Sequence, residues 1–355
     1  MRILEARNPD QGLAQALQQV LLYGIPTDSR NGPVLRFSTP VTTAWTSPLQ
    51  RVSFSAVRDA NPAFALMEAL WMLAGRNDIK TMGFYAKQML SYSDDGETQN
   101  AAYGHRWRTH FGHDQLDEVV EILKKDPNSR QAVVQIWDHV DLTKSTKDKA
   151  CNTQAIFDIV HGCLNMTICN RSNDIIWGCY GANVVHFSLL LEYMANRIGV
   201  PVGTYYQMSN NLHLYTEFDI TKRFIEPREQ VYATGRNPYS IVANSLAYQD
   251  LYVAGGGVRP MSLGADVPGF EDELQEIVND YQSTKRYIRG IPFFNEVAEP
   301  MRCAYACWKD GNKAVAEAII AGAKGAYRDK HGHDNDWLTA MHRWIGRRIY
   351  KEQQA

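Results

Sequence analysis

The amino-acid sequence predicts an α+β protein in which a mixed β-sheet is covered by long apolar helices. Residues 62–75 and 184–198 are apolar around almost the whole helical circumference, as expected of helices buried on all sides. Strand-like stretches at 155–160 and 163–169 are separated by His161-Gly162, a two-residue turn typical of a β-hairpin. Buried helices together with a hairpin favour a sheet covered by helices.

The first helix is expected over residues 12–23, because apolar residues recur there at helical spacing until Gly24-Ile25-Pro26 ends the run. Proline is favoured in the first turn of a helix and glycine directly after its end, so Pro62 and Gly75 bound the second helix. Residues 115–125 show an amphipathic pattern and predict a third.

A strand is expected over residues 131–137 (QAVVQIW), ahead of the hairpin. The apolar helix over 184–198 ends at Gly199, the residue type that most often terminates a helix. The C-terminal part of the chain is expected to be helical, with helices over 271–283, 312–324 and 336–350.

Composition excludes several classes of protein. The 355 residues carry a formal net charge of −2, so no general basic field favours direct nucleic-acid binding. No run of 18 apolar residues predicts a membrane span, and the N-terminus lacks the order of a secretory signal. Six cysteines show no disulfide framework, which favours reduced thiols in the cytoplasm.

One carboxylate stands in an apolar helix. Glu68 lies in the middle of AFALMEALWML at 63–73, where both neighbouring turns are apolar. A buried carboxylate needs a partner or takes a raised pKa, because desolvation disfavours its charged form. Either this helix face meets water, or Glu68 is a general acid or base at the floor of a pocket.

Cys151 is a candidate nucleophile. It lies in a polar loop, KSTKDKACNTQ at 144–154, directly before a strand. Lys147 and Lys149 would favour its thiolate if they face it, because a nearby cation lowers the pKa of a thiol. Loop cysteines are also commonly inert, so both interpretations stand on this feature alone.

Polar residues also follow the second hairpin strand. Arg171 and Ser172 suit an oxyanion such as phosphate, since they offer a forked cation and a hydroxyl. Asp174 and Asn183 suit a heterocycle, because both accept hydrogen bonds and asparagine also donates. The alternative is an ordinary polar turn.

A further predicted strand ends in SNNLHLY at 209–215. His213 and Tyr215 are two residues apart and therefore point to the same face of the strand, as two side chains that bind the hydroxyls of one sugar must do. Two groups resemble metal sites only superficially. Cys303 and Cys307 lack a second ligand pair, and the loop His331-Gly332-His333-Asp334 is better explained by helix capping through Asp334 or Asp336. No metal is expected.

Taken together, these pieces resemble the thymidylate synthase superfamily, including its phage-type pyrimidine nucleotide hydroxymethylases. The resemblance runs in order from Gly24 to about Tyr215, over half of the chain. It is carried by GIPTDSRNG at 24–32, EALWMLAGRND at 68–78, AAYGHRWR at 101–108, NSRQAVVQIW at 128–137, ACNTQ at 150–154, CNRSNDIIWG at 169–178, GANVVHFSLL at 181–190 and SNNLHLY at 209–215.

The resemblance implies a thymidylate synthase-like catalytic domain over 1–270, followed by a helical C-terminal extension over 271–355. It implies a pyrimidine nucleoside monophosphate as substrate and 5,10-methylenetetrahydrofolate as the one-carbon donor. It also implies a homodimer, in which Arg130 matches an arginine that reaches into the neighbouring site. The expected compartment is the cytoplasm, that of the host if a phage encodes the chain.

Individual roles follow from the same resemblance. Cys151 would be the thiolate that adds to C6 of the pyrimidine, with Tyr103 lining the cavity near it. Glu68 would order water and move protons at the base, and Asp174 would lie near the folate and the reacting ring. The remaining roles are phosphate binding by Arg30, Arg130, Arg171 and Ser172, base recognition by Asn183, and sugar binding by His213 and Tyr215.

Several positions depart from the family pattern. Asn152 follows the nucleophile where typical synthases carry histidine, and Gln131 replaces a second arginine after Arg130. Residues 86–96 (AKQMLSYSDDG) offer no match for the tryptophan that covers the reacting methylene. The match of Asn183 needs one inserted residue, and the C-terminus does not resemble the short apolar tail of the synthases.

These departures favour a particular product. Once the one-carbon unit is attached to C5, hydride transfer gives a methyl group and attack by water gives a hydroxymethyl group, so water exclusion decides the outcome. We therefore expect 5-hydroxymethylation of dUMP. The alternatives are thymidylate synthase activity, hydroxymethylation of dCMP or CMP, and a non-catalytic nucleotide-binding protein that kept the fold.

Overall fold

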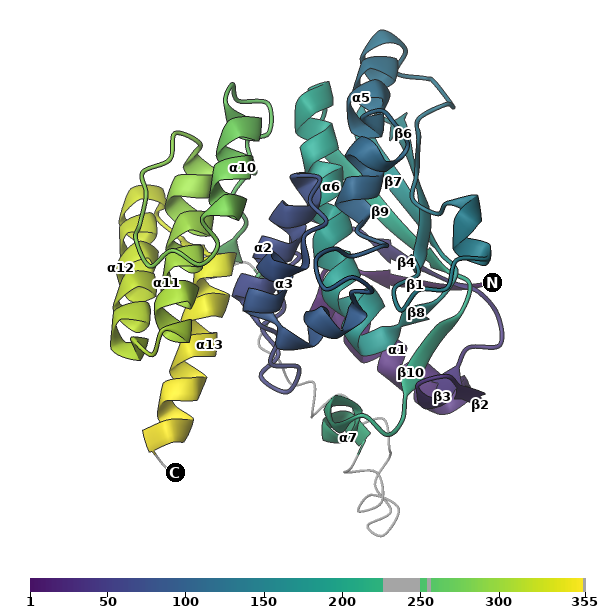
Figure 1. The fold of residues 1–355 in the computed structure, drawn as a ribbon, viewed down its shortest axis with the longest axis horizontal. Helices are drawn as coiled ribbons and strands as arrows, with labels where there is room; N and C mark the ends of the chain where they lie inside the picture. Colours follow the sequence, from purple (N-terminus) through teal and green to yellow (C-terminus); the bar gives the residue numbers. More distant parts are fainter. Residues whose placement is uncertain (226–249, 254–256, 354–355) are drawn as a thin grey trace.

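The computed structural model describes residues 1–225, 250–253 and 257–353. Figure 1 shows a β-sheet with helices packed on one side, and beside it a group of helices from the C-terminal part of the chain. The predicted α+β class, with a mixed sheet and a helical C-terminal stretch, is confirmed.

The central sheet has six strands in the order β1-β4-β9-β7-β6-β5. The pairs β1–β4 and β7–β9 are parallel and the other pairs are antiparallel, so the sheet is mixed. The strands are β1 Arg2–Ala6, β4 Val41–Trp45, β5 Val133–Gln135, β6 Asn152–Val160, β7 Cys163–Asn170 and β9 Val202–Ser209.

The predicted hairpin is confirmed as β6 and β7. Its two turn residues, His161 and Gly162, have φ values of +52° and +77°. Two successive residues with positive φ match the right-handed twist of the flanking strands. The strand expected over 131–137 is shorter, since β5 covers only Val133–Gln135.

One face of this sheet forms the core. On β7, Leu164, Met166 and Ile168 are fully buried beneath the helices, whereas the alternating residues are only half-buried. The helices on the buried face include α1 (Pro9–Tyr23), α5 (Gln115–Lys125) and α6 (Asn183–Ile198), visible in Figure 1. The opposite face of the sheet carries no helix from the described residues.

Helix boundaries follow capping signals. Helix α1 starts three residues earlier than expected, because the Asn8 side chain accepts from the Gln11 amide and Pro9 occupies the first turn. The expected helices over 62–75, 115–125 and 184–198 appear as α2 (Pro62–Leu73), α5 and α6. Gly199 ends α6 with φ +87°.

A π-helical stretch that the sequence analysis missed leads directly into α6. It is η4, Ile175–Ala182, and a π turn holds one residue more than an α turn. Within the described residues, Ile175–Ile198 is long and apolar enough to cross a membrane, but 78% of its apolar window is buried in the protein. A core helix passes the same test.

A second sheet of four strands has the order β2-β3-β10-β8. Its strands are β2 Ile25–Ser29, β3 Gly32–Arg36, β8 Asn173–Asp174 and β10 Leu212–Tyr215. Strand β10 pairs with β3 on one side and with β8 on the other. Motifs that lie far apart in the sequence are therefore joined in one small sheet.

The C-terminal helices α10, α11 and α13 contact α2, which lies between them and the sheet (Figure 1). These elements are α10 Phe270–Asn279, η5 Phe294–Ala298, α11 Glu299–Lys309, α12 Lys313–His331 and α13 Asp336–Gln353. Helix α12 is longer than expected and α11 was not predicted. The division of the chain at residue 270 stays a prediction.

Shorter elements complete the described fold. They are α3 Ile79–Tyr85, η1 Lys87–Tyr92, α4 Tyr103–His105, η2 Arg106–His110, η3 His139–Leu142, α7 Asp219–Ile225, β11 Val258–Arg259 and β12 Asp334–Asn335. Strands β11 and β12 pair in parallel, so the stretch before α10 is joined to the start of α13.

Candidate active site

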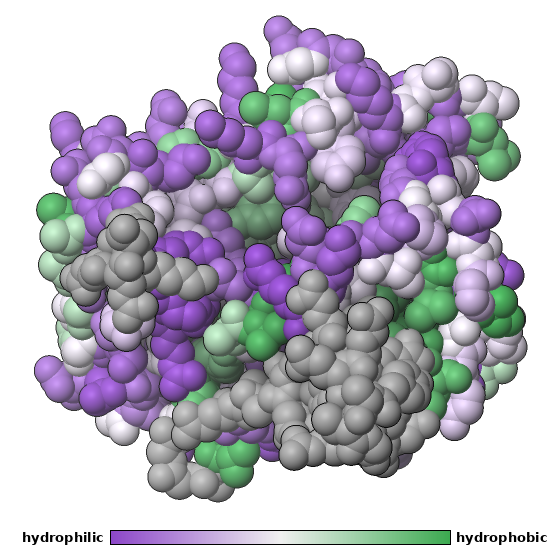
Figure 2. Space-filling model, turned by 90° about the horizontal axis from the view of Figure 1, so that it is seen from below, coloured by the Kyte–Doolittle hydropathy of each residue, from purple (hydrophilic) through white to green (hydrophobic). Residues whose placement is uncertain are grey.

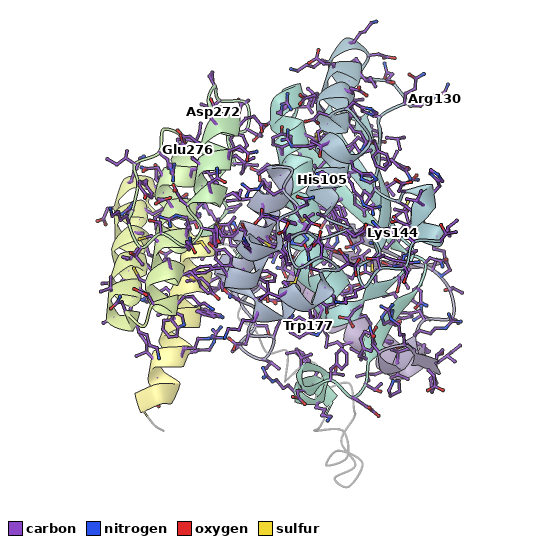
Figure 3. The ribbon with its side chains drawn as sticks, viewed as in Figure 1. His105, Arg130, Lys144, Trp177, Asp272 and Glu276 are labelled. Carbon is purple, nitrogen blue, oxygen red and sulfur yellow. The ribbon has the colours of Figure 1, made fainter. Side chains whose placement is uncertain are left out.

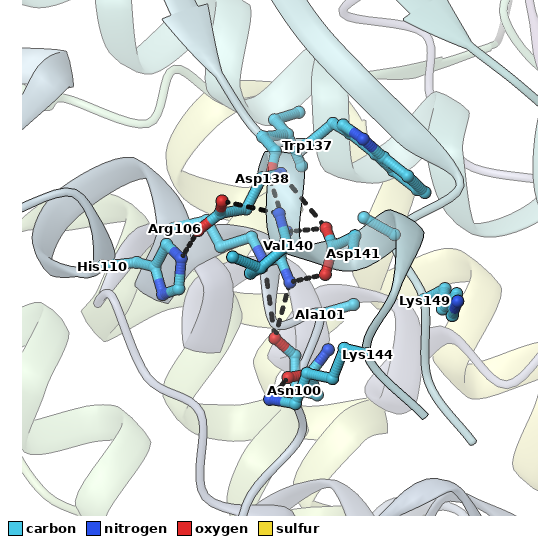
Figure 4. Close-up of polar contacts among 12 residues, drawn as sticks. Asn100, Ala101, Arg106, His110, Trp137, Asp138, Val140, Asp141, Lys144 and Lys149 are labelled. Carbon is cyan, nitrogen blue, oxygen red and sulfur yellow. Dashed lines mark hydrogen bonds and ion pairs between the residues drawn. The ribbon is translucent and has the colours of Figure 1, made fainter. Parts of the chain in front are cut away.

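The loop that carries Cys151 is held by a buried ion pair. The Arg106 guanidinium donates to both Asp141 carboxylate oxygens and to the carbonyl of Ile136 (Figure 4). Next to it, the Asp148 carboxylate accepts from the Ala101 amide at 2.9 Å. The loop between β5 and β6 is thereby fixed to residues 100–106, the segment that also provides Tyr103.

Cys151 lies immediately before β6, beside an arginine. The Arg171 guanidinium lies 3.9 Å from the Cys151 Sγ and donates to the Ala150 carbonyl at 2.8 Å. The Cys151 amide donates to the Tyr103 hydroxyl at 3.3 Å. The structure thus brings together the predicted nucleophile, one predicted phosphate ligand and the predicted cavity residue.

Burial raises the pKa of the Cys151 thiol, while the positive charges of Arg171 and Arg30 act to lower it. The lysines proposed from the sequence are not the relevant cations. The Lys147 ammonium donates to the Ser93 carbonyl, and that of Lys149 to the Leu142 carbonyl. That hypothesis was wrong because neighbours in sequence diverge in a loop, whereas Arg171 arrives from the next strand.

The small sheet brings four further predicted residues together. Arg30 lies exposed in the turn between β2 and β3, where the side chain of the adjacent Asn31 donates to the Tyr215 hydroxyl at 3.5 Å. His213 and Tyr215 pack edge to face with ring centroids 5.1 Å apart. His213 also pairs with Asp174 across β10 and β8.

Ser172 is half-buried in the turn between β7 and β8, one residue after Arg171. Arg171 and Ser172 therefore lie between the Cys151 loop and the small sheet.

Asn183 belongs to a chain of buried amide and hydroxyl groups. Its Nδ2 donates to the Asn173 Oδ1 at 3.1 Å, and the Asn173 Nδ2 donates to the Ser209 Oγ at 3.1 Å. This chain leaves one N–H and the carbonyl oxygen of Asn183 for a ligand. The π turn η4 directly before Asn183 occupies the place where the match to the family needs one inserted residue.

Asp174 caps η4 by accepting from the Trp177 amide. Burial raises the pKa of Asp174 to about 6, against the lowering effect of that hydrogen bond and of Arg58. The Arg58 guanidinium lies 4.7 Å from the centroid of the Trp177 ring and donates to the Ile176 carbonyl. Asp174 therefore lies close to an arginine and a tryptophan that sequence reasoning did not identify.

Glu68 has a histidine partner. Its Oε2 lies 2.9 Å from the His186 Nε2, and only 12% of the Glu68 side chain is exposed. The other imidazole nitrogen of His186 is buried and has no hydrogen-bond partner among the described residues. The partner that a carboxylate in an apolar helix requires is therefore supplied by α6.

Glu68 lies on the wall of a cavity of about 500 Å³, the size of a ligand pocket. The wall combines flat aromatic rings with arginines. Those side chains are Trp177, Tyr180, Trp337 and Trp344, with Arg51, Arg58, Arg223 and Arg348. Cys151 is not part of this lining. Helix α6 connects the two groups, because His186 contacts Glu68 and Phe187 stacks on Tyr103, which accepts from the Cys151 amide.

Two views show the setting of the cavity. Trp177 lies on the lower part of the sheet body, on the side where α7 is found (Figure 3). From below, the molecule is hollowed, with apolar surface inside and hydrophilic side chains around it (Figure 2). Aromatic walls next to cations fit a folate, which has two flat ring systems and an anionic glutamate.

The tryptophan missing from residues 86–96 does not leave this cavity without aromatic walls. Trp177 comes from η4, and Trp337 and Trp344 come from α13. In residues 87–92 the helix η1 has no buried side chain. These three tryptophans therefore come from the segment 169–178 and from the C-terminal helices, and the family resemblance assigned none of them a role.

Arg130 is separate from all these groups. It is exposed, makes no hydrogen bond or ion pair within the described part of the chain, and points away from the body in Figure 3. Its neighbour Gln131 is exposed as well. Arg130 therefore does not contact the other site residues of its own chain in this structure.

No group of three or more metal-binding side chains occurs in residues 1–225, 250–253 and 257–353. Of the two aspartates expected to cap the helix after this loop, Asp336 accepts from the Trp337 amide at 2.8 Å in the first turn of α13, and also from the Tyr252 hydroxyl. Asp334 does not cap the helix and pairs with Arg328 instead. Asn335, which was not expected to cap, accepts from the Leu338 amide.

Sequence reasoning assigned no role to four residues of the site. His186 lies in the segment 181–190 that carries the family resemblance, whereas Arg58 and the two α13 tryptophans lie outside all of the segments that carry it. The available signal was a polar residue in a buried helix, the same signal that identified Glu68. His186 in VVHFSLLL at 184–191 carries it.

Comparison with known proteins gives a consistent picture. The family model described as thymidylate synthase matches residues 13–237. A deoxyuridylate hydroxymethyltransferase of Pseudomonas phage M6 is 41% identical over 353 residues, which cover 98% of this chain and 95% of the relative.

Two other relatives match shorter parts of the chain. A deoxyuridylate hydroxymethyltransferase of Bacillus phage SP01 is 40% identical over 65% of this chain and 63% of its own. A thymidylate synthase of Buchnera aphidicola subsp. Baizongia pistaciae is 30% identical over 42% of this chain and 58% of its own.

Proposed function

The chain belongs to the thymidylate synthase family, and on this premise we propose that it hydroxymethylates dUMP at C5, with 5,10-methylenetetrahydrofolate as the one-carbon donor. One observation carries the proposal. The relative named deoxyuridylate hydroxymethyltransferase aligns with 98% of the chain, including the C-terminal helices that lie outside the family match. The groups around Cys151, Asn183 and Glu68 supply the chemistry that this reaction needs.

The nucleotide binds across the ends of β6, β7 and the small sheet. Arg30, Arg171 and Ser172 take the phosphate as charged and hydroxyl donors. His213 and Tyr215, on one face of β10, take the sugar. These phosphate and sugar ligands lie on the small sheet or in the turns next to it and to strand β7.

Cys151 begins the reaction. Its thiolate adds to C6 of the uracil ring, and the electron pair of the C5–C6 double bond moves toward O4, so C5 becomes nucleophilic. Arg171, at 3.9 Å from the sulfur, stabilises the thiolate. After C5 has bonded to the one-carbon unit, a base removes the C5 proton, and sulfur later leaves C6 as the double bond re-forms.

The folate supplies the one-carbon unit at the oxidation level of formaldehyde. The cavity next to Glu68 is its binding site in this proposal, since aromatic rings and arginines line it. In this proposal, loss of the C5 proton would break the bond between the methylene and tetrahydrofolate, which would leave an exocyclic methylene on C5. Glu68, oriented by His186, positions a water molecule and takes its proton as the oxygen bonds to this methylene. The electrons of the methylene double bond return to the ring and expel the Cys151 sulfur from C6. The product then carries a hydroxymethyl group and no hydride is consumed.

Uracil is the base in this proposal because of Asn183. Its free N–H donates to O4 and its carbonyl oxygen accepts from N3–H, while Asn173 holds the amide in that orientation. Cytosine has an amino donor in place of O4 and an unprotonated N3 in place of N3–H. Its amino group would therefore face the N–H of Asn183, and its N3 would face the carbonyl oxygen. Turnover of dUMP, dCMP and CMP in one mixture with methylenetetrahydrofolate tests the proposal, and preferential loss of a cytosine nucleotide would contradict it.

Asn183→Asp should shift selectivity toward dCMP, because a carboxylate accepts from the cytosine amino group and repels O4 of uracil. We expect a change of about 1–3 kcal/mol in relative kcat/KM, the range of an exchanged hydrogen-bonding pattern. Asn196→Asp, near the other end of α6, is the matched control and should keep the wild-type ratio. Unchanged selectivity in Asn183→Asp would remove Asn183 from base recognition.

The active form in this proposal is a homodimer joined through the open sheet face. The half-buried residues there mix apolar and small polar side chains, such as Ile156, Thr167 and Met208, a composition suited to association. Arg130 extends outward from the segment just before β5, at the edge of the same sheet. In this dimer, Arg130 of each subunit would bind the nucleotide phosphate in the site of the other subunit.

Mixing inactive Arg130→Ala and Cys151→Ala subunits should restore activity if Arg130 acts across the dimer. Half of the randomly formed dimers are mixed and each has one intact site, so recovery should approach about a quarter of wild-type activity. Arg171→Ala mixed with Cys151→Ala is the control, because Arg171 and Cys151 touch within one subunit and no intact site can form. Equal recovery in both mixtures, or none in the first after proven subunit exchange, contradicts sharing.

A further inference from the structure

We propose that the C-terminal helices form a fixed wall of the folate cavity and bind the aminobenzoyl-glutamate part of the folate through Trp337, Trp344 and Arg348. This inference rests on the proposed function and extends it to a part of the chain beyond the family match at 13–237. All three side chains come from α13 and line the cavity that also contains Glu68.

The C-terminal helices are docked firmly. Tyr305 of α11 stacks on Tyr85 with ring centroids 4.9 Å apart, and its hydroxyl donates to the Tyr85 carbonyl at 2.9 Å. The Gln275 side chain donates to the Ala74 carbonyl at 2.8 Å, at the end of α2. Such packing is typical of a permanent interface, so the wall does not depend on closure of a tail.

A cluster of ion pairs connects α13 to the residues just before the start of α2. Asp59 accepts from the guanidinium groups of both Arg347 and Arg348, at distances of 2.9–3.2 Å. One carboxylate shared by two arginines leaves one positive charge in excess. Asp59 also has a φ of +46°, a left-handed conformation that is unfavourable for an aspartate without such local support.

The same cluster presents a cation and an aromatic ring to the cavity. The Arg348 guanidinium lies 3.6 Å from the centroid of the Trp344 ring. The Trp344 side chain is 5% exposed, and its indole nitrogen has no hydrogen-bond acceptor among the described residues. A ring flanked by a cation suits an aminobenzoyl group that carries a carboxylate.

The two ends of the folate would lie next to different parts of α2. Glu68 is six positions after Pro62 on α2, a rise of roughly 9 Å at 1.5 Å per residue. Glu68 belongs to the end where the one-carbon unit meets the nucleotide, and Asp59 with Arg348 belongs to the end where α2 begins. A folate with its reacting end near Glu68 therefore extends its glutamate toward α13.

Direct binding to the dUMP-saturated full-length protein tests this inference. Tetrahydrofolate is the probe, because it lacks the transferable carbon, and calorimetry gives its Kd. We expect Trp344→Leu and Arg348→Met to weaken binding about tenfold or more, as truncations of a buried aromatic or arginine anchor do. Arg343→Met is the matched control, since Arg343 belongs to the same helix and lies 6.0 Å from the Phe54 ring, outside the cavity lining.

A second ligand sharpens the assignment. Tetrahydropteroate has the aminobenzoyl ring but lacks the glutamate, so Trp344→Leu should weaken both ligands and Arg348→Met should weaken tetrahydrofolate more. Trp337→Leu is a second aromatic variant in case Trp344→Leu also loses dUMP binding, which would mark a folding defect.

The possible outcomes separate the inference from the function. If wild type binds tetrahydrofolate and the variants bind it equally well, the wall has no role in folate recognition and the inference is wrong. If the wild-type complex with dUMP does not bind tetrahydrofolate at all, the proposed function fails first. A tenfold loss in the variants, with dUMP affinity and the control unchanged, supports both.

Discussion

Cys151→Ser should lose at least about 10⁴-fold in kcat while it still binds dUMP. A serine hydroxyl is almost never ionised near neutral pH, so the addition to C6 on which every later step depends is lost. The phosphate and base contacts come from other residues, so nucleotide affinity should change little. Calorimetry with dUMP and a turnover assay on the same preparation measure both quantities.

The pH dependence of the same step follows from the environment of the thiol. Burial raises the pKa of Cys151, so the thiolate fraction increases with pH across the neutral range and kcat/KM should rise with it. Arg171 lowers that pKa, so Arg171→Met should move the rising limb of the pH profile of kcat/KM to higher pH, whereas Lys149→Met should not.

For the first prediction, near-normal turnover by Cys151→Ser would exclude covalent catalysis by Cys151.

Glu68→Gln should reduce turnover by about 10²- to 10⁴-fold, the range of a lost general acid or base. Glutamine keeps the size of the side chain and can still hydrogen-bond His186, but it cannot take a proton from water. Asp219→Asn is the matched control, because Asp219 lines the same cavity and has no role in the proposed chemistry. Its turnover should stay within a few-fold of wild type.

The measurement for Glu68 must separate catalysis from binding. Affinity for dUMP and for tetrahydrofolate should be nearly unchanged in Glu68→Gln, while single-turnover product formation is slow. If both affinities fall together with turnover, Glu68 supports the cavity structurally. If Asp219→Asn is equally slow, the effect belongs to the charge of the cavity and not to Glu68.

Much of the fold could be predicted because local signals agreed with the tertiary structure. Helix α5 matches its expected limits, since its amphipathic pattern and its caps point to the same residues. Helix α11 escaped detection because Glu299 and Arg302 are both fully buried as an ion pair, against the rule that charged residues face water. Its true environment depends on partners that no local pattern reveals.

Three residues from separate segments of the family resemblance lie together in the structure. Cys151 contacts both Tyr103 and Arg171, because the hairpin and the loop before it fix their relative positions, and the roles of these residues stay predictions. The lysine hypothesis was wrong because it took proximity in sequence for proximity in space. The α13 tryptophans lie more than 250 residues from Glu68 along the chain, so only the folded structure places them on one wall.

The identity of the product tests the central claim most directly. Wild-type protein is incubated with dUMP and 5,10-methylenetetrahydrofolate in water enriched in heavy oxygen, and the nucleotide is analysed by mass spectrometry. The account predicts a 5-hydroxymethyl nucleotide whose new oxygen carries the solvent label, with tetrahydrofolate released and no dihydrofolate absorbance. A 5-methyl nucleotide formed together with an equal amount of dihydrofolate would contradict it and show a thymidylate synthase.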